Sequence, residues 1–497
     1  MSSINWHARA EQTTFQVKNF IDGAYVDCLG EVLITKNAAR DGALLYQFAE
    51  GTGEEVDQAV ANAKAAFEDG RWADLSIYER QSVMEKLADL LQANHEELAL
   101  YECMDVGKPI TKALNQDIAA ATNYLRSAAR AATSMVCPSG SNGGVIAYQE
   151  RTPVGVVGGI VGWNFPLTLA AQKVGPALMM GNSLVLKPSE FTSLSACRFA
   201  ELAIEAGVPN GVFNVVNGAG KTVGDRLARH PDVGLMTFVG SSATGKQMMI
   251  SAGQSNMKRV ILECGGKSPY LVFDDCPADL DGLAADIVDT AFPNQGALCV
   301  AGTRLLLQAG IREKLLPKIL KLTQALVPQD PLDPDTGFGA IMDRAHMHKV
   351  LGYIDSGKKE GAELLLGGNQ VRAETGGFYI EPTIFDQVDP NAKIAQEEIF
   401  GPVLSVLSFE TEEQAIAIAN NSDYGLAAYA ATMDSARARR LGRKLNAGIF
   451  ACVSTSTPRG GGVSIPIEGH KQSGFGLEGG VEGLKAYTVA TMVNQYI

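Results

Sequence analysis

The 497-residue sequence lacks the features that mark several large classes of protein. It has no run of about 18 uninterrupted apolar residues, so we expect no membrane-spanning helix. No basic segment leads into an apolar one near the start, so we expect no secretory signal. The 42 Lys and Arg are outnumbered by 55 Asp and Glu, and a formal charge of −13 would repel nucleic acid. We therefore predict neither a membrane nor a nucleic-acid partner.

Cysteine and histidine are also scarce. The eight cysteines are scattered and do not form a disulfide framework, which favours the reducing cytoplasm. Of the six histidines, His346 and His348 are two residues apart and would face different sides of a helix, and no HExxH or CxxC motif occurs. We therefore expect no metal site.

What is present is a globular chain, 46% apolar and long enough for two or three domains. Apolar spacing predicts helices over residues 54–69 and 116–132. From Pro153 short apolar strands alternate with helices, and a second alternation follows Pro269, which predicts βαβ units. The predicted fold class is α/β, with two parallel-sheet, Rossmann-like domains that meet near residue 265.

A small β arm is predicted from two further segments. Residues 136–152 resemble a glycine-rich loop that leads into an extended strand. The C-terminal run from Lys485 alternates like a strand, and its unpaired edge favours pairing with residues 145–150 or with another subunit.

Cys299 and Glu263 are the candidate reactive pair. Most cysteines in soluble proteins are small buried apolar residues, but Cys299 follows Gly296 and precedes Ala301-Gly302, where the backbone can pass close to a ligand. A soft nucleophile and a carboxylate base could divide a two-step reaction between them. The other seven cysteines are interpreted as structural, except that Cys264 adjoins Glu263.

Polar residues follow the expected strands, where an open α/β sheet binds ligands. These are Asn164, Lys187 with Glu190, and residues 240–241. Each also has a simple structural interpretation: Asn164 as a turn residue, Glu190 as an acid at a helix N-terminus, and Glu398 further on as a solvated charge.

Three glycine patterns imitate nucleotide-binding motifs. Residues 474–479 match GxGxxG by letter, but no βαβ unit can follow them. Residues 240–246 resemble a P-loop, yet Gln247 stands where a hydroxyl is needed for magnesium, which argues against an ATPase. Residues 218–224 are one residue too long for the dinucleotide fingerprint, although such a turn still offers amides to a phosphate. A plain helix entry explains that turn equally well.

Six runs of the sequence form one set, in order and spacing. They are Gly162–Pro166, Leu186–Glu190, Phe238–Ser241, Leu262–Pro269, Asn294–Cys299 and Glu397–Val403. Taken together, they resemble the aldehyde dehydrogenase superfamily over essentially the whole chain, and the sequence is most similar in appearance to the bacterial γ-glutamyl-γ-aminobutyraldehyde dehydrogenases. The resemblance implies an aldehyde-dehydrogenase-like fold and NAD-dependent, non-acylating oxidation of an aldehyde to the carboxylic acid.

The resemblance also implies a role for each site residue. Cys299 would attack the aldehyde, Asn164 and the Cys299 N–H would stabilise the oxyanion, and Glu263 would activate water. Relatives that pass the acyl group to coenzyme A do not need this base, so Glu263 favours hydrolysis. NAD is the implied cofactor, because a carboxylate at Glu190 disfavours a 2′-phosphate. The implied cofactor-binding residues are Ile160, Val161, Gly162, Trp163, Lys187, Ser189, Glu190, Gly220, Gly224, Gly240, Ser241, Glu398 and Phe400.

The resemblance further assigns the domains and the assembly, a homodimer or homotetramer. Residues 1–132 and 153–265 would form the NAD-binding domain, residues 266–465 the catalytic domain, and residues 133–152 and 480–497 the oligomerisation arm.

Several positions depart from the family pattern. Gly162 replaces a usual proline, Gln172 stands where close relatives often carry tryptophan, and residues 466–469 replace Pro-Phe-Gly-Gly. The preceding run, residues 452–465, lacks the aromatic and acidic residues of the tunnel loop and carries Arg459 instead. The cationic tail of an amino-aldehyde would need an acidic or aromatic side chain in that loop, so these departures disfavour an amino-aldehyde. The substrate class is left open among a bulky, an aromatic and an amino-aldehyde.

Two alternatives remain at this stage. One is an ester hydrolase that uses Cys299 without a redox step, and the other is a non-catalytic relative that serves as a binding or structural protein. A Cys–His hydrolase has no positive support, since no histidine adjoins Cys299 in sequence.

Overall fold

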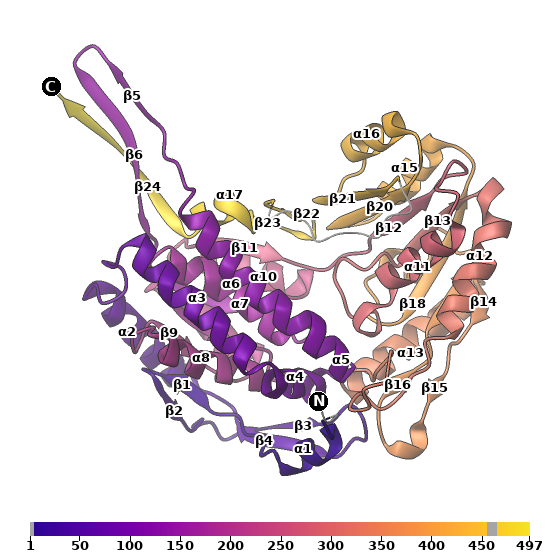
Figure 1. Cartoon of the computed structure of the whole chain (residues 1–497), viewed down its shortest axis with the longest axis horizontal. Coiled ribbons are helices and arrows are strands. Elements are labelled where there is room, and N and C mark those ends of the chain that lie inside the picture. Colours follow the sequence, from indigo (N-terminus) through magenta and orange to yellow (C-terminus); the bar gives the residue numbers. More distant parts are fainter. Residues whose placement is uncertain (1–3, 455–464) are drawn as a thin grey trace.

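The computed structural model describes residues 4–454 and 465–497. Figure 1 shows two lobes side by side and a β arm that projects from the first lobe. Each lobe is built on one large sheet, of eight strands in the first lobe and seven in the second. The predicted α/β fold class is confirmed. No helix in the described ranges combines the length and hydropathy of a membrane span.

Five parallel strands form the centre of the first sheet. The strand order reverses beside β7, with β8 and β9 on one side and β10 and β11 on the other, which is the topological switch point of an open α/β sheet. The full order is β2 (Ala24–Val26), β1 (Asn19–Ile21), β9 (Phe213–Val215), β8 (Ser183–Lys187), β7 (Val156–Ile160), β10 (Val233–Val239), β11 (Arg259–Glu263) and β23 (Gly474–Phe475).

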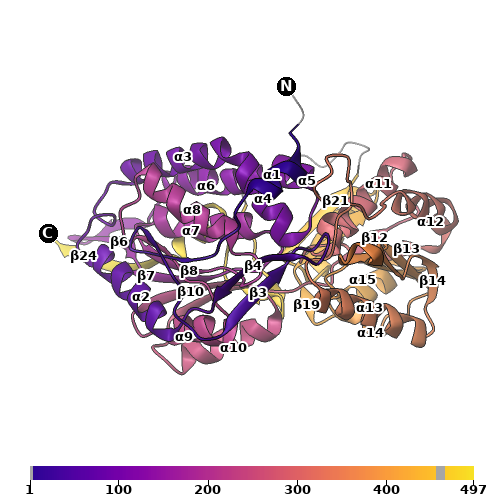
Figure 2. The ribbon, with the colours of Figure 1, turned by 90° about the horizontal axis from the view of Figure 1, so that it is seen from below.

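Helices cover both faces of this sheet, as Figure 2 shows. One face carries α3 (Ile77–Ala93), α4 (His95–Val106), α6 (Ile118–Ala132), α7 (Pro166–Met179) and α8 (Leu194–Ala206); the other carries α2 (Gly53–Glu68), α9 (Asp225–Arg229) and α10 (Ser242–Gly253).

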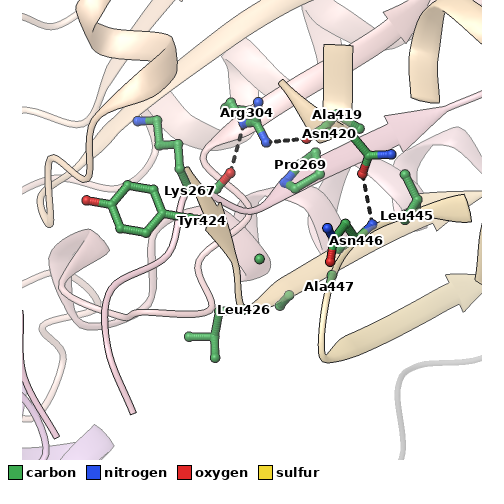
Figure 3. Close-up of a pocket in the computed structure, with 13 residues that line it drawn as sticks. Lys267, Pro269, Arg304, Ala419, Asn420, Tyr424, Leu426, Leu445, Asn446 and Ala447 are labelled. Carbon is green, nitrogen blue, oxygen red and sulfur yellow. Dashed lines mark hydrogen bonds between the residues drawn. The ribbon is translucent and has the colours of Figure 1, made fainter. Parts of the chain in front are cut away.

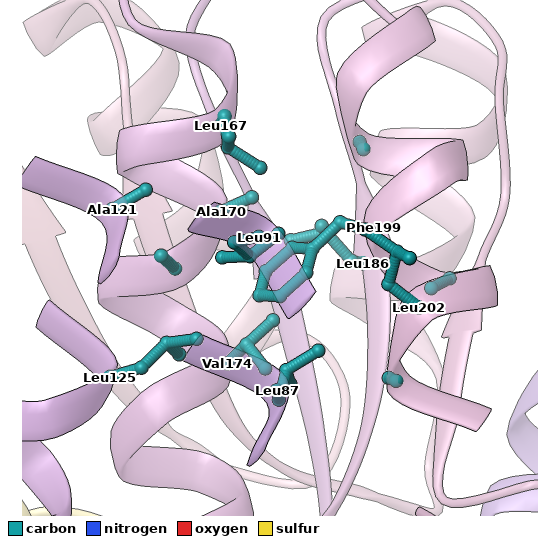
Figure 4. Packing of buried hydrophobic residues seen from close by; sticks show 14 of the residues in the cluster. Leu87, Leu91, Ala121, Leu125, Leu167, Ala170, Val174, Leu186, Phe199 and Leu202 are labelled. Atoms are coloured by element: carbon teal, nitrogen blue, oxygen red, sulfur yellow. The ribbon is translucent and has the colours of Figure 1, made fainter. Parts of the chain in front are cut away.

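The core of this lobe lies between the first set of helices and β8 (Figure 4). Leu87 and Leu91, four residues apart on α3, share one face and pack with Leu125 of α6, Val174 of α7 and Phe199 of α8. All five side chains are fully buried. This packing fixes α6 and α7 beside each other.

The second sheet is parallel except at its β14 edge. Its order is β14 (Glu363–Leu366), β17 (Thr383–Asp386), β18 (Val403–Phe409), β13 (Arg304–Gln308), β12 (Pro269–Val272), β20 (Ala427–Ala431) and β21 (Ile449–Val453). Its main helices are α11 (Leu280–Ala291), α12 (Ala309–Gln324), α13 (Arg344–Lys359), α15 (Glu412–Asn420) and α16 (Ser435–Lys444).

The connection between the two sheets runs from Glu263 to Pro269, and the predicted boundary near residue 265 falls within it. After the second sheet the chain returns to the first lobe, where β23 pairs with β11 and α17 (Gly480–Lys485) follows. The assignment of functional domains stays a prediction.

The arm is a three-stranded antiparallel sheet of β5 (Ser139–Asn142), β6 (Val145–Pro153) and β24 (Thr488–Tyr496). As expected, the C-terminal strand pairs with residues 145–150, and the register extends from Thr488 opposite Pro153 to Tyr496 opposite Val145.

Smaller elements complete the chain and include one difference from prediction. The sequence predicts a helix over residues 222–230, whereas the structure begins there with a π-helical turn, Gly220–Gly224, and continues as the short α9. A second π-helical turn, Ala113–Asp117, leads into α6. The others are α1 (Trp6–Gln12), β3 (Leu33–Asn37), β4 (Leu44–Ala49), α5 (Ile110–Lys112), β15 (Gln370–Val371), β16 (Tyr379–Ile380), α14 (Lys393–Gln396), β19 (Tyr424–Gly425) and β22 (His470–Lys471).

Candidate active site

The loops that follow β7, β10 and β11 meet at the switch point of the first sheet. Asn164 lies in the loop after β7, and Glu263 is the last residue of β11. After β10, the Gly240 N–H donates to the Glu263 carbonyl at 3.0 Å, and the Ser241 hydroxyl caps α10 by accepting from the Thr244 N–H at 3.3 Å. Three neighbouring strand ends therefore deliver an amide, a carboxylate and a capped helix N-terminus to one place.

A cavity of about 600 Å³ opens at this place, between the two lobes. Cys299, Glu263 and Asn164 all line it. The sulfur and the carboxylate predicted to act on one substrate thus face a common space. Gly162, Trp163, Gly240, Ser241, Glu398 and Phe400, all predicted to hold the cofactor, also line this cavity.

Cys299 follows a turn in an unusual backbone conformation. Asn294 (φ 49°), Gln295 (φ 55°) and Gly296 (φ 75°) are consecutive residues in the left-handed region, which costs energy for the two that are not glycine. Hydrogen bonds hold the turn: the Gln295 amide donates to the Ala340 carbonyl at 3.1 Å, and the Asn294 amide donates to the Asn164 carbonyl at 2.9 Å. The position of Cys299 is therefore fixed by its surroundings and not by local preference.

Asn164 is held against the same loop. Its buried Nδ2 donates to the Ala297 carbonyl at 3.0 Å. A side-chain amide has two N–H groups, so a second donor remains for a ligand. On the other side Gly266 passes very close, and a Cβ there would lie 2.2 Å from the Cys299 carbonyl oxygen. Only glycine fits at this crossing.

Burial raises the pKa of the Cys299 thiol to about 12, and the charges of Glu398 and Glu263 act in the same direction. The thiol is therefore protonated at neutral pH in the protein alone. Burial also raises the pKa of Glu263 to about 7; the charge of Lys173 opposes this shift and Glu468 adds to it. One Glu263 oxygen, Oε1, is buried without a hydrogen-bond partner among the described residues. A carboxylate of this kind can exchange a proton near neutral pH.

Lys173 and Glu478 are site residues that sequence reasoning missed. Lys173 is fully buried on α7 and ion-paired with Glu478, whose other oxygen accepts from the Gln172 amide at 2.6 Å. Burial lowers the pKa of Lys173 to about 8, against the opposing charge of Glu263. The available signal was a lysine among the apolar residues of α7, but its partner is remote in sequence.

Glu398 and Phe400 approach the cavity from the second lobe. The Gly266 N–H donates to Glu398 Oε1 at 2.9 Å. Phe400 has a left-handed backbone (φ 59°), its carbonyl lies 2.7 Å from His346 Nε2, and its ring is edge-on to that of Trp163 at 5.3 Å. These contacts join the β7 loop of the first lobe to the second lobe.

Arg304 of β13 anchors the connection that carries Gly266. Its fully buried guanidinium donates to the carbonyls of Lys267 and Ala419, at 2.8 Å each (Figure 3). Burial lowers its pKa to about 10. Because Lys267 directly follows Gly266, this contact also stabilises the turn around Glu398.

The remaining predicted cofactor residues lie outside the cavity, at the carboxyl ends of β7 and β8 and in the π-helical turn after β9. Buried Lys187 donates to Glu190 Oε2 at 3.1 Å, and the Val161 N–H donates to the Lys187 carbonyl at 3.2 Å. Ile160 ends β7, and a Cβ on Gly224 would lie 3.7 Å from both Ile160 and Lys187 side chains. Ser189 is also buried here, and Gly220 has open space in place of a side chain.

This arrangement fits a dinucleotide. Glu190 offers a carboxylate to ribose hydroxyls at one end, Gly240 and Ser241 open a helix N-terminus suited to a pyrophosphate, and Glu398 offers a second carboxylate beside Cys299.

Comparison with known proteins agrees with the geometry. The aldehyde dehydrogenase family model matches residues 27–493. The NADP/NAD-dependent aldehyde dehydrogenase PuuC of Escherichia coli (strain K12) is 43% identical over 486 residues, which cover 97% of this chain and 96% of PuuC. Two crystal structures each cover 99% of both chains: a mutant of the P. syringae indole-3-acetaldehyde dehydrogenase AldA in complex with NAD+ and IAA (43% identity, TM-score 0.96), and the γ-glutamyl-γ-aminobutyraldehyde dehydrogenase from Burkholderia cenocepacia J2315 (42% identity, TM-score 0.95). The chain therefore belongs to the aldehyde dehydrogenase family and is an NAD-dependent enzyme that oxidises an aldehyde to the carboxylic acid.

Proposed function

We propose that Cys299 is the nucleophile of this oxidation, Asn164 the oxyanion donor, and Glu263 the base that releases the product as a free acid. The supporting observation is that one cavity brings the three side chains together with Glu398, although they come from both lobes.

The first half of the reaction centres on Cys299. The Cys299 thiol gives its proton to the ionised carboxylate of Glu263 in the same cavity, and the resulting thiolate adds to the aldehyde carbon to leave a thiohemiacetal with a negative oxygen. The free N–H of Asn164 and the backbone N–H of Cys299 stabilise that oxygen, and one such donor is typically worth about 10²–10³ in rate. Re-formation of the carbonyl expels a hydride, which NAD held in this site would accept, and a thioester remains on Cys299. Glu263 then returns its proton to solvent.

The second half centres on Glu263. Its ionised carboxylate takes a proton from a water molecule that attacks the thioester, which contributes about 10²–10⁴ in rate. Lys173 keeps the pKa of Glu263 near neutral, so the base form is available at physiological pH. The ion pair of Lys173 with Glu478 extends this set of ionisable groups away from Cys299.

The cofactor residues are proposed in three groups. Lys187, Ser189 and Glu190 hold the adenosine end, where the carboxylate favours NAD over NADP. The two glycine turns would hold the pyrophosphate, and residues beside Cys299 would hold the nicotinamide ribose and ring. The pyrophosphate group is Gly220, Gly224, Gly240 and Ser241; the nicotinamide group is Glu398 and Phe400, with Ile160, Val161, Gly162 and Trp163 as the floor.

Two variants test these roles. Cys299→Ala should abolish NADH formation, whereas Glu263→Gln should give one burst of NADH and then accumulate a thioester visible as an added acyl mass on the intact protein. Cys276→Ala, a half-buried cysteine in the second lobe, is the matched control and should keep full activity. NADH formation by Cys299→Ala, or steady turnover by Glu263→Gln at the rate of the unaltered enzyme, would refute the assigned role of that residue.

The cavity walls favour a bulky or aromatic aldehyde. Leu169, Leu298, Val300, Ile449 and Ile467 make much of its lining apolar. The names of two relatives mention an indole aldehyde and a γ-glutamyl-aminobutyraldehyde. Arg459, the loop residue whose positive charge speaks against an amino-aldehyde substrate, lies outside the described residues.

Assembly and compartment are proposed as well. The three-stranded arm carries exposed apolar side chains, among them Ile146, Tyr148 and Met492, and we propose that it pairs subunits into a homodimer or homotetramer. The eight scattered cysteines, which form no disulfide framework in the sequence, favour the cytoplasm.

A further inference from the structure

A second chamber of about 350 Å³ adjoins the catalytic cavity. The two spaces share the lining residues Ala120, Tyr124, Gln172 and Ile467. The catalytic cavity therefore continues past these four side chains, and we call the space beyond them the outer chamber.

Three helices contribute to its walls. On α6, Asn123, Tyr124 and Ser127 follow Ala120 by three, four and seven residues, and this spacing places all four on one helix face. Ala120 lines both spaces, whereas Ser127 lines only the outer chamber, about 10 Å further along the helix axis. Helix α7 contributes Gln172 and Pro176, and α17 contributes Gly480, Gly483 and Leu484.

The outer chamber has an apolar side and a polar side. Pro176, Ile465, Ile467 and Leu484 are apolar. The polar side comes from α6, where Asn123 and Ser127 make no side-chain hydrogen bond with any described residue. They are available donors and acceptors for a ligand.

The described part of the outer chamber's lining offers no free charge. Among its described lining residues Glu478 alone carries a charged side chain, and its two oxygens are taken by the Lys173 ammonium and the Gln172 amide. A cationic tail would find no free carboxylate among these residues, whereas an uncharged polar tail would find hydrogen-bond partners on α6.

We propose that the outer chamber binds the tail of the aldehyde and selects uncharged tails with hydrogen-bonding groups, such as an amide, over cationic tails. This inference rests on the proposed function, because it takes the aldehyde carbon to be at Cys299. Gln172, Asn123 and Ser127 are then specificity-determining residues.

Matched substrates test the charge preference. The aldehyde 6-(trimethylammonio)hexanal and its neutral isostere 7,7-dimethyloctanal differ in one charge, while 6-acetamidohexanal and nonanal have equal chain length and differ in the amide. With the NAD-loaded enzyme, kcat/KM should be at least tenfold higher for the isostere than for the cation, and at least as high for the acetamido aldehyde as for nonanal. Equal or better turnover of the cation would overturn the proposal.

A matched pair of variants tests the location. Ser127→Phe fills the outer chamber and should lower kcat/KM for nonanal and 6-acetamidohexanal at least tenfold, while propanal, too short to reach it, stays within twofold. Ser134→Phe, the same change at an exposed position beyond the end of α6, should alter neither. An equal loss for propanal and nonanal in Ser127→Phe would refute this binding site.

The polar side is tested by Asn123→Ala combined with Ser127→Ala. This double variant should lower kcat/KM for 6-acetamidohexanal more than for nonanal, and an equal effect on both would contradict the assigned hydrogen bonds. Propanal distinguishes failure of this proposal from failure of the proposed function.

If the enzyme oxidises propanal normally but has equal kcat/KM for aldehydes with charged and uncharged tails, only the outer-chamber proposal is overturned. If it forms no NADH from any aldehyde, the proposed function is overturned, and this inference with it.

Discussion

Replacing Lys173 with methionine should move the pH dependence of thioester hydrolysis. Lys173 is the principal charge that opposes the raised pKa of Glu263, which is about 7. An opposite charge within about 4–6 Å lowers a carboxyl pKa by about 1–3 units. Without that charge, we expect the pKa of Glu263 to rise by about one to two units, so the ionised fraction at pH 7 falls from about one half to between about 9% and 1%.

The expected result is a fivefold to fiftyfold slower hydrolysis at about pH 7, with recovery as the pH rises above the new pKa. Stopped-flow measurement separates the steps: the burst of NADH reports acylation of Cys299, and the steady rate after it reports hydrolysis when hydrolysis is limiting. The burst should change much less than the steady rate. Profiles between pH 6 and pH 10 should show the hydrolysis limb displaced to higher pH.

A control is needed because Lys173→Met leaves Glu478 as a buried carboxylate without its cation, which is costly in itself. The double variant Lys173→Met, Glu478→Gln removes both charges and should show the same displaced profile with a higher melting temperature than the single variant. If the pH dependence of thioester hydrolysis in the double variant is the same as in the unaltered enzyme, the electrostatic role of Lys173 is refuted.

Three further predictions concern single positions. Glu398→Gln removes a charge that raises the pKa of Cys299, so alkylation of the NAD-free enzyme by iodoacetamide at pH 8 should be about threefold faster or more, and a slower reaction would contradict this. Glu190→Ser should raise the ratio of kcat/KM for NADP to that for NAD about tenfold, since it removes the carboxylate that repels a 2′-phosphate; an unchanged ratio would argue against this placement. Gly266→Ala places a Cβ 2.2 Å from the Cys299 carbonyl oxygen and should abolish activity and cost about 1–3 kcal/mol of stability, whereas Gly352→Ala, with nothing within 4 Å of its Cβ, should leave activity intact.

Much of the fold was predictable because its strands are short apolar runs with clear ends. The apolar run at residues 403–409 predicts a strand with the bounds of β18 (Val403–Phe409), and the run at residues 183–186 predicts all of β8 (Ser183–Lys187) except its last residue. The positions of Asn164 and Glu263 at strand ends followed from the same pattern, because parallel strands deliver their carboxyl ends to one edge.

Other parts depend on contacts that local sequence does not encode. The pairing of Lys173 with Glu478 joins residues that are far apart in the chain, and a lysine in a helix is ordinarily a surface residue. The left-handed turn at Asn294 and Gln295 is unfavourable for Gln295 in particular, and side-chain hydrogen bonds from both residues to distant carbonyls hold it. The outer chamber is a property of packed helices and leaves no pattern in either helix alone.

The late return of the chain to the first lobe matters for how the protein is made. β23 completes the edge of a sheet whose other strands were translated long before it, and β24 supplies the partner of β6 (Figure 1). On the ribosome, the edge of β11 and the long ribbon of β6 must wait, exposed, while the whole second lobe emerges. Nascent chains in that interval present bare strand edges, and capture by chaperones at this stage would shield them from pairing with one another.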